Sequence, residues 1–291
     1  MNDKAKALMT EAANTIIAAI TEGIANPDGW VAPWHRINLN PVNAVTGKHY
    51  TGGNRLVLAL HTLDSGALPY WATYKQWESI GAQVRKGEKS VAILRPASRK
   101  VDNDDGTTTV KVFGFRAHPV FHAGQVDGFE VPVDDTPSVD HATVAEAFAW
   151  GLTTGADIVE HDAAGASYSP LADRITMPAR HRWTSVDGAW STLAHELAHW
   201  TGHESRLARK FGTFGSDGYA FEELVAELSA AFTMAALGRQ SEPRPDHAQY
   251  LAHWLKVLGD DPELLWKAAA AAEKAAGFVL AAAGDRELAA V

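Results

Sequence analysis

The spacing of apolar residues predicts two parts with different secondary structure. The first part combines helices and strands, with helical spacing over 1–23, 56–63 and 74–80 and β-branched runs over 90–94, 107–115 and 117–121. The Asp-, Asn- and Gly-containing segment 102–106 predicts a turn between the first two strands. From about residue 138 the spacing is mostly helical, and only 173–178 predicts a strand.

Residues 131–140 contain Pro and Asp without periodicity and are interpreted as a linker. We therefore predict an α+β fold with two domains: an α+β domain over residues 1–130 and a mostly helical domain over 141–291. At 291 residues the chain is long enough for each domain to bury a core of its own. The last two helices, near 247–258 and 262–283, are expected to support the second domain.

The second part contains the pattern H-E-x-x-H at His195, Glu196 and His199. Residues four apart lie on one face of a helix, so the two imidazoles can bind one metal ion. Glu196 is the candidate general base, which would take a proton from a water at the metal. Gly202 follows the pattern and is expected to end this helix. A buried pair of structural histidines would give the same spacing.

A second helix downstream is expected to supply the third ligand, because it carries Glu223 and Glu227 one turn apart. Zinc peptidases with a glutamate ligand take it from such a helix, and a further acidic residue often orients a ligand histidine. We assign Glu223 as the ligand and Glu227 as the orienting residue. The reverse assignment also fits, since both residues lie on one face. Zinc is the usual ion for two histidines and a carboxylate, and manganese, iron or cobalt would accept the same ligands.

Two further features are expected near this site. The strand at 173–178 precedes the metal-binding helix, where zinc peptidases place an edge strand that pairs with an extended peptide substrate. A plain structural strand is the alternative. Tyr219 and His203 are candidates for an additional group that polarises the peptide carbonyl. His203 lies four residues beyond His199 rather than the six of metzincins, so we do not assign it as a ligand.

Composition limits the classes of function. The chain has no cysteine, so disulfides and thiolate ligands are excluded, and any metal is held by His and carboxylate groups. No stretch approaches the roughly 18 apolar residues of a membrane span, and residues 1–23 lack the features of a signal peptide. We therefore expect a cytoplasmic protein without a membrane partner.

Charge is distributed unevenly along the chain, although the formal net charge is −9. Residues 1–100 carry 12 Lys and Arg against 7 Asp and Glu, whereas residues 101–291 carry 14 against 28. This asymmetry indicates that the two parts have different partners.

Aromatic and basic residues in the first part indicate binding of single-stranded DNA. Proteins that bind single strands combine stacking rings with cations that contact the phosphates. The candidate DNA-binding residues are Tyr50, Asn54, Arg55, Trp71, Tyr74, Lys75, Gln76, Arg85, Lys86 and Lys89. Two alternatives stay open: aromatic rings at this density also fill protein cores, and a basic turn is often simply solvated.

Taken together, these segments resemble the ArdC family of antirestriction proteins, which plasmids and other mobile elements carry. The resemblance covers nearly the whole chain. It is carried by Pro33-Trp34, Tyr50 to Asn54, Trp71 to Gln76, Val84 to Lys89, Asp173 to Pro178, His195 to Gly202, Tyr219-Ala220, Glu222 to Leu228 and Tyr250 to Leu255. One departure is His122-Ala123, where the family usually has Asn-Val, so no role of that pair is carried over.

The resemblance implies an N-terminal domain that binds single-stranded DNA and a zincin-like metallopeptidase domain. It further implies protection of incoming DNA from host restriction, with His195, His199 and a downstream glutamate as metal ligands and Glu196 as the base. A host restriction component would be the protein substrate. Two alternatives stay open: a DNA-masking protein whose metal is structural or inactive, and a zinc peptidase unrelated to DNA.

Overall fold

The computed structural model describes residues 3–25, 31–35, 39–62, 68–102, 107–132, 143–163, 165–213, 215–242 and 251–284. Of the predicted linker at 131–140, only residues 131 and 132 are described. Most of the predicted turn at 102–106 also lies outside the described residues.

Both helices and strands occur in the first part of the chain, which confirms the α+β prediction. Its elements are α1 (Asp3–Ala25), the 3-10 helix η1 (Pro33–His35), β1 (Val42–Asn43), α2 (Gly52–Leu60), β2 (Tyr70–Ala72), α3 (Tyr74–Ser79), β3 (Gln83–Val84), β4 (Val91–Asp102), β5 (Thr108–His122), the 3-10 helix η2 (Ala123–Gln125) and β6 (Val126–Asp127). The helices predicted at 56–63 and 74–80 correspond to α2 and α3.

Helices dominate the second part, as predicted, although the sequence did not reveal two of its strands, β7 and β8. Its elements are α4 (Val144–Thr153), β7 (Asp157–His161), β8 (Ser167–Ser169), β9 (Arg174–Pro178), the 3-10 helix η3 (Arg180–Arg182), α5 (Val186–Thr201), α6 (Asp217–Ala236), α7 (Leu251–Asp260) and α8 (Glu263–Ala282). None of the helices that the structure describes is both long and apolar enough to span a membrane.

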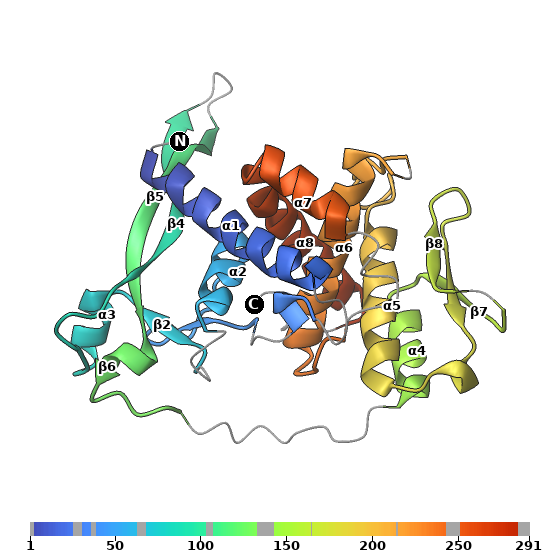
Figure 1. Cartoon of the computed structure of the whole chain (residues 1–291), viewed down its shortest axis with the longest axis horizontal. Helices are drawn as coiled ribbons and strands as arrows, with labels where there is room; N and C mark the ends of the chain where they lie inside the picture. Colours follow the sequence, from blue (N-terminus) through green and yellow to red (C-terminus); the bar gives the residue numbers. More distant parts are fainter. Residues whose placement is uncertain are drawn as a thin grey trace.

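The strands β4 and β5 form a long antiparallel hairpin that projects from the rest of the molecule (Figure 1). They belong to a sheet in the order β1-β2-β5-β4, where β1 and β2 are parallel and the other pairs antiparallel. The prediction of separate strands at 107–115 and 117–121 is wrong, because β5 runs through both. The pairing register of β4 and β5 shifts after the pair Ala97–Gly114, as at a β-bulge, and the two strands stay paired on both sides of the shift.

The second part has its own sheet, in the order β7-β9-β8. β9 is parallel to β7 and antiparallel to β8, so hydrogen bonds occupy both of its edges. The strand predicted at 173–178 is therefore present, but its expected role as an edge strand is wrong. β8 lies at an edge of this sheet and contacts α5.

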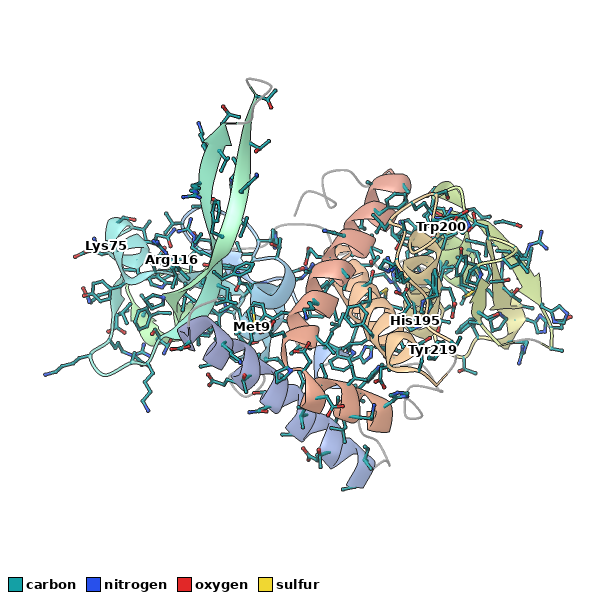
Figure 2. All side chains as sticks on the ribbon, turned by 90° about the horizontal axis from the view of Figure 1, so that it is seen from above. Met9, Lys75, Arg116, His195, Trp200 and Tyr219 are labelled. Atoms are coloured by element: carbon teal, nitrogen blue, oxygen red, sulfur yellow. The ribbon has the colours of Figure 1, made fainter. Side chains whose placement is uncertain are left out.

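The largest cluster of buried side chains joins both parts of the chain. Buried residues of α1, η1 and α2 pack there against buried residues of α6, α7 and α8. One face of α1 is apolar, since its buried side chains recur every four residues at Leu8, Ala12, Ile16 and Ile20. Trp34 of η1 lies edge-on to Trp254 of α7, with ring centroids 5.8 Å apart. Figures 1 and 2 show α1 lying across the C-terminal helices, which it contacts.

Two glycines allow α2 to approach α8 closely. A Cβ atom at Gly53 would lie 1.9 Å from Cε3 of Trp266 on α8, so a side chain does not fit at this position. The amide of Gly52, whose φ is 57°, donates to Oε2 of Glu273 at 2.9 Å. The sequence placed the candidate DNA-binding residues Tyr50, Asn54 and Arg55 around these glycines. The structure instead makes these glycines the start of α2, packed against α8.

Arg55 of α2 connects the two parts of the chain through an ion pair and hydrogen bonds in the interior. Its Nη1 lies 3.2 Å from Oε1 of Glu273, and the guanidinium also donates to Asn40 and to the carbonyl oxygens of Leu39 and Phe232. Burial lowers the pKa of Arg55, while the charge of Glu273 and its hydrogen bond raise it. A buried cation requires such a complete set of acceptors.

Arg55→Ala is expected to destabilise the whole fold, because the change removes the cation that pairs with Oε1 of Glu273 and the donor to the carbonyl oxygens of Leu39 and Phe232. Breaking a buried ion pair costs about 3 kcal/mol. Urea unfolding of the metal-free protein, followed by tryptophan fluorescence, measures the loss. Arg85→Ala is the matched control, since Arg85 is exposed and its pairs with Glu88 and Asp127 are solvated. Equal shifts in the two variants would contradict the prediction.

Candidate metal centre and nucleic-acid interface

Two packed helices, α5 and α6, bring the candidate metal ligands together. Ser185 caps the start of α5 and Ser216 caps the start of α6, each by accepting a backbone N–H hydrogen bond. The residues of α5 from Ala189 to Thr201 are all buried. This burial explains why apolar residues surround the H-E-x-x-H motif on every side.

One atom each of His195, His199 and Glu223 faces a common point, and these ligand atoms lie within 4.8 Å of one another. The Nε2 atoms of the two histidines are 3.1 Å apart. Nε2 of His195 lies 3.5 Å from Oε2 of Glu223, and Nε2 of His199 lies 3.5 Å from Oε1. Two histidines and a carboxylate at this spacing form a set of ligands that a divalent cation accepts. Within the part of the chain that the structure describes, this is the one group of His, Asp and Glu side chains with such a geometry.

A carboxylate behind each histidine determines which ring nitrogen faces the common point. Glu227 Oε2 lies 3.1 Å from His195 Nδ1, and Glu222 Oε1 lies 3.2 Å from His199 Nδ1. An ionised carboxylate only accepts hydrogen bonds, so each Nδ1 carries the hydrogen and each Nε2 presents a lone pair. Two lone pairs that face each other at 3.1 Å repel, and a cation between them removes the conflict. The chemistry of the donor set thus fits a metal ion.

Arg209 holds the carboxylate of Glu222 with two hydrogen bonds, of 2.7 Å and 3.0 Å. The same guanidinium donates to the Ala198 carbonyl at 2.7 Å and to the Thr201 hydroxyl at 2.8 Å, both on α5. Arg209 therefore fixes Glu222 relative to the helix that carries His199. The sequence did not reveal this pair, because Glu222 differs from its neighbour Glu223 only in the direction in which it leaves the helix.

Gly202 follows the last residue of α5, as predicted, but its backbone is not left-handed, since its φ is −74°. A Cβ atom at Gly202 would lie 2.7 Å from Cζ of Phe211 and 3.0 Å from the carbonyl oxygen of His199. Glycine is needed here because the loop after α5 returns closely against the helix. That return brings Arg209 to the metal centre.

The surroundings keep the two neighbouring glutamates ionised. Burial would raise the pKa of Glu223, but the hydrogen bond and the charges that His195 and His199 supply when they are protonated, together with a hydrogen bond from Tyr219, outweigh this effect and lower it to about 2. Burial opposes ionisation of Glu222 as well, and its hydrogen bonds with His199 and Arg209 nevertheless lower its pKa. Both side chains are therefore hydrogen-bond acceptors and potential ligands at neutral pH.

The remaining candidates differ in their distance from the site. Glu196 follows His195 on α5 and is buried, with 1% of its surface exposed. The side chain of Tyr219, at the start of α6, forms a hydrogen bond with Glu223. His203 instead bonds Ser205 Oγ at 2.8 Å, beyond the end of α5. Of the two proposed electrophiles, the structure brings Tyr219 to the metal centre.

A small polar cluster fixes β8 beside the metal centre. Tyr168 on β8 donates to Asp173 at 2.8 Å, and Arg206 bonds the same carboxylate. Burial raises the pKa of Tyr168, and the hydrogen bond and charge of Asp173 raise it further. The ring of Phe211 lies 6.1 Å from that of Tyr168 and 6.4 Å from that of His199. The edge strand is thus close to the ligand histidines.

The structure separates the predicted DNA-binding residues into exposed and internal ones. The exposed side chains are Tyr74, Lys75, Arg85, Lys86 and Lys89. Arg55 and Trp71 are buried, with 4% and 2% of their surface exposed, so neither offers a surface to DNA. Asn54 bonds the backbone N–H and carbonyl of Leu94 with its two amide atoms, each at 2.7 Å. These three residues hold the fold together.

The two other predicted residues, Tyr50 and Gln76, line a hollow of about 250 Å³ beside the first sheet. Asn43 lies between them and donates to the Tyr50 hydroxyl at 3.0 Å and to Gln76 Oε1 at 3.2 Å. Lys48, His49, Arg95 and His118 are among the other residues that line this hollow.

A second hollow of the same volume lies alongside, and Arg95 and His118 line both. It adds Arg116, which pairs with Arg95 across the β4–β5 hairpin. Arg95 and Arg116 are not among the DNA-binding residues predicted from the sequence. Side chains of a strand alternate with a period of two residues, so Arg116, His118 and Val120 lie on one face of β5. This alternation was the sequence pattern from which the position of Arg116 could have been predicted.

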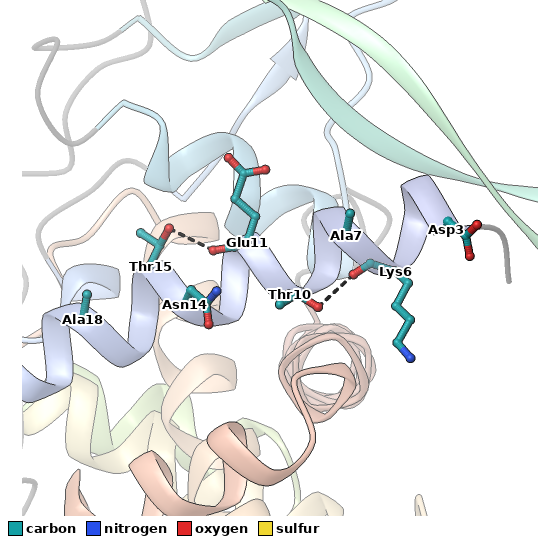
Figure 3. A pocket seen from close by; sticks show the side chains of 8 residues that line it. All are labelled: Asp3, Lys6, Ala7, Thr10, Glu11, Asn14, Thr15 and Ala18. Carbon is teal, nitrogen blue, oxygen red and sulfur yellow. Dashed lines mark hydrogen bonds between the residues drawn. The ribbon is translucent and has the colours of Figure 1, made fainter.

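A further hollow, of about 760 Å³, is lined by residues of α1 alone (Figure 3). The hydroxyls of Thr10 and Thr15, which line it, donate to carbonyl groups of their own helix, those of Lys6 and Glu11.

Comparison with known families matches both parts of the chain. Residues 6–121 match the family model of the N-terminal domain of anti-restriction factor ArdC. Residues 144–271 match the model of a zincin-like metallopeptidase. Together with the helix pair α5–α6, these matches define a two-part protein with a zincin-like metal centre.

Similar proteins match across almost the whole chain. Uncharacterized protein y4eC of Sinorhizobium fredii (strain NBRC 101917 / NGR234) is 35% identical over an alignment of 289 residues that covers 94% of this chain and 91% of that protein. DNA primase TraC of Escherichia coli is 35% identical over an alignment of 302 residues that covers 97% of this chain but only 28% of the primase. The chain spans little more than a quarter of TraC, so the primase activity is not transferred.

Solved structures give the same result. The antirestriction protein ArdC from plasmid R388 is 33% identical and covers 95% of this chain and 98% of its own, with TM-scores of 0.76 for the metal-free and 0.74 for the Mn(II)-bound structure. The chain belongs to the ArdC family of antirestriction proteins. The zincin-like match and the Mn(II)-bound relative imply a divalent metal in this centre, without selecting zinc.

Glu223→Ala and Glu227→Ala are expected to lower metal affinity to different degrees. The first change removes a proposed ligand and should abolish binding at micromolar metal. The second removes an orienting hydrogen bond, which costs about 10- to 100-fold in affinity. Competition of Mn²⁺ or Zn²⁺ with a chelating dye measures both constants. The reverse order of the two effects would assign Glu227 as the ligand.

Proposed function

We propose that the first part of the chain binds single-stranded DNA, while the second part is a metal-dependent peptidase. The two activities together protect incoming DNA of a mobile element from host restriction in the cytoplasm. The observation that carries the proposal is the convergence of His195, His199 and Glu223 beside the buried Glu196. A purely structural metal site has no need of a carboxylate base next to the ligands.

In this proposal His195, His199 and Glu223 hold Zn²⁺, or Mn²⁺ as in the relative. When bound, the ion supplies Lewis acidity and makes water a better nucleophile near neutral pH. Glu196 accepts a proton from the attacking water and passes it to the amine nitrogen that leaves. Tyr219, which lies at Glu223, donates a hydrogen bond to the peptide carbonyl oxygen as its charge develops.

We further propose that an extended segment of a protein substrate pairs with β8. Extended peptides bind by adding a strand to an open sheet edge. β8 lies at an edge of its sheet and is held close to His199 through Tyr168 and Phe211. A component of the host restriction system is the proposed substrate, which connects the peptidase to the antirestriction role of the family.

For DNA, we propose a path that follows the cations of the first part. Arg95 and Arg116 lie opposite each other on the hairpin, and Lys48 and Tyr50 line the adjoining hollow. Phosphates would contact the cations, while bases would stack on exposed rings. The exposed Tyr74, Lys75, Arg85, Lys86 and Lys89 extend the set of candidate contacts.

Glu196→Gln tests whether peptidase chemistry is needed. The substitution keeps the size of the side chain but removes the base, and loss of such a base costs about 100- to 10,000-fold in rate. We expect metal content and DNA affinity to be unchanged, while the fraction of incoming DNA that survives in a restricting host falls to the level without the protein. Full protection by this variant would instead favour a protein that masks DNA stoichiometrically.

The double variant Arg95→Ala/Arg116→Ala tests the DNA path. Each lost phosphate contact lowers the slope of log affinity against log salt concentration by about 0.7 for single strands. Fluorescence anisotropy with single- and double-stranded oligonucleotides across a salt series measures this slope. Arg174→Ala is the control, since Arg174 is an exposed cation of the second part, paired with Asp157. An unchanged slope in the double variant would move the DNA path elsewhere.

A further inference from the structure

A histidine from the first part of the chain reaches the metal centre of the second part. His35 of η1 lies within residues 6–121, which match the ArdC N-terminal domain, and 160 residues before His195. Only 2% of its side chain is exposed. Its Nε2 lies 3.3 Å from Oε1 of Glu227, and its Nδ1 lies 2.7 Å from Oγ of Ser241.

Glu227 is therefore held at both of its oxygens. Oε2 accepts from Nδ1 of His195 at 3.1 Å, and Oε1 faces Nε2 of His35. One arrangement of hydrogens satisfies every atom: the Ser241 hydroxyl donates to His35 Nδ1, and His35 Nε2–H donates to Glu227. A carboxylate with one free oxygen can rotate about its terminal bond, whereas a carboxylate bonded at both oxygens cannot.

The opposite side of the metal centre has the same arrangement, in which a carboxylate orients a histidine and a further residue holds that carboxylate. His199 is oriented by Glu222, which Arg209 holds in turn through two hydrogen bonds. Arg209 belongs to the second part of the chain, as do its partners Glu222, Ala198 and Thr201. His195 is oriented by Glu227, and His35 of the first part bonds Glu227. A support for Glu222 thus comes from the second part, and a support for Glu227 comes from the first.

We propose that His35 is a positioning residue of the metal centre, so that the first part of the chain completes the site at which the second part binds its metal. This proposal builds on the ligand set proposed above. The segment around His35 has anchors of its own: Trp34 packs on Trp254, and Asn40 donates to the Ala235 carbonyl at 2.6 Å. Removal of the imidazole therefore leaves the segment in place.

His35→Ala tests the proposal through metal affinity, measured on the full chain by competition of Mn²⁺ with a chelating dye. Loss of a residue that orients a metal ligand through another group costs about 10- to 100-fold in affinity. His35→Gln keeps a donor that can reach Glu227 and is expected to recover part of the loss. His61→Ala is the matched control, because His61 belongs to the same part and bonds only the Val57 carbonyl through Nδ1. Its affinity for Mn²⁺ should equal that of the unmodified chain.

A double variant separates positioning from general damage. If His35 acts through Glu227, His35→Ala/Glu227→Ala binds Mn²⁺ no more weakly than Glu227→Ala alone. A further loss in the double variant, or unchanged affinity in folded His35→Ala, overturns the proposal. Ser241→Ala gives a second test if His35→Ala fails to fold. It removes the partner of His35 Nδ1 and should weaken Mn²⁺ binding less than His35→Ala, whereas no change at all counts against the proposal.

The result is independent of the proposed peptidase and DNA-binding activities, since neither is measured. Failure of Glu223→Ala to weaken Mn²⁺ binding would refute the ligand set itself. Normal behaviour of Glu223→Ala together with unchanged affinity in the His35 variants would refute only the positioning role.

Discussion

Four glutamates lie buried in the helix pair α5–α6, and their charges must be compensated where water is excluded. Glu196, Glu222, Glu223 and Glu227 are each at most 5% exposed. His195 and His199 bond Glu227 and Glu222, and Arg209 and His35 contact the same two glutamates from outside the helix pair. The loop that returns after Gly202 carries Arg209 to Glu222, and η1 carries His35 to Glu227. The remaining negative charge faces the point where three ligand atoms meet, which favours a divalent cation there.

The same constraint connects the two parts of the chain. A helix pair with this many buried charges needs rigid neighbouring elements. Buried residues of α1, α2 and η1 pack against α6, the second helix of the pair, and supply part of this packing. The alanines of α8 permit close approach, so that Gly53 and Arg55 of α2 reach Trp266 and Glu273. The sheet β1-β2-β5-β4 is attached to this arrangement through contacts of α2 with β4. The proposed functions are divided between the parts, but the core is shared.

The sequence revealed those features that depend on local geometry. His195 and His199 are four residues apart, and a helix alone places them on one face. The same argument selected the helix that carries Glu223. The structure could not be predicted where partners are distant in the chain. Arg55 looked like a DNA contact because its partner, Glu273, is 218 residues away. The strand β9 was expected at a sheet edge but lies in the centre of its sheet. The prediction failed because β8, which has three residues and pairs with β9, is too short to be recognised in the sequence.

A protein whose parts share a core cannot easily exchange one of them. Recombination near residue 135 would separate Arg55 from Glu273 and His35 from Glu227, and would leave two incomplete cores. We therefore expect natural relatives to inherit the two parts as a single cassette. The match with TraC has this form: it includes 97% of this chain within a protein more than three times as long. In evolution the unit that moves between mobile elements is then the pair of parts and not either part alone.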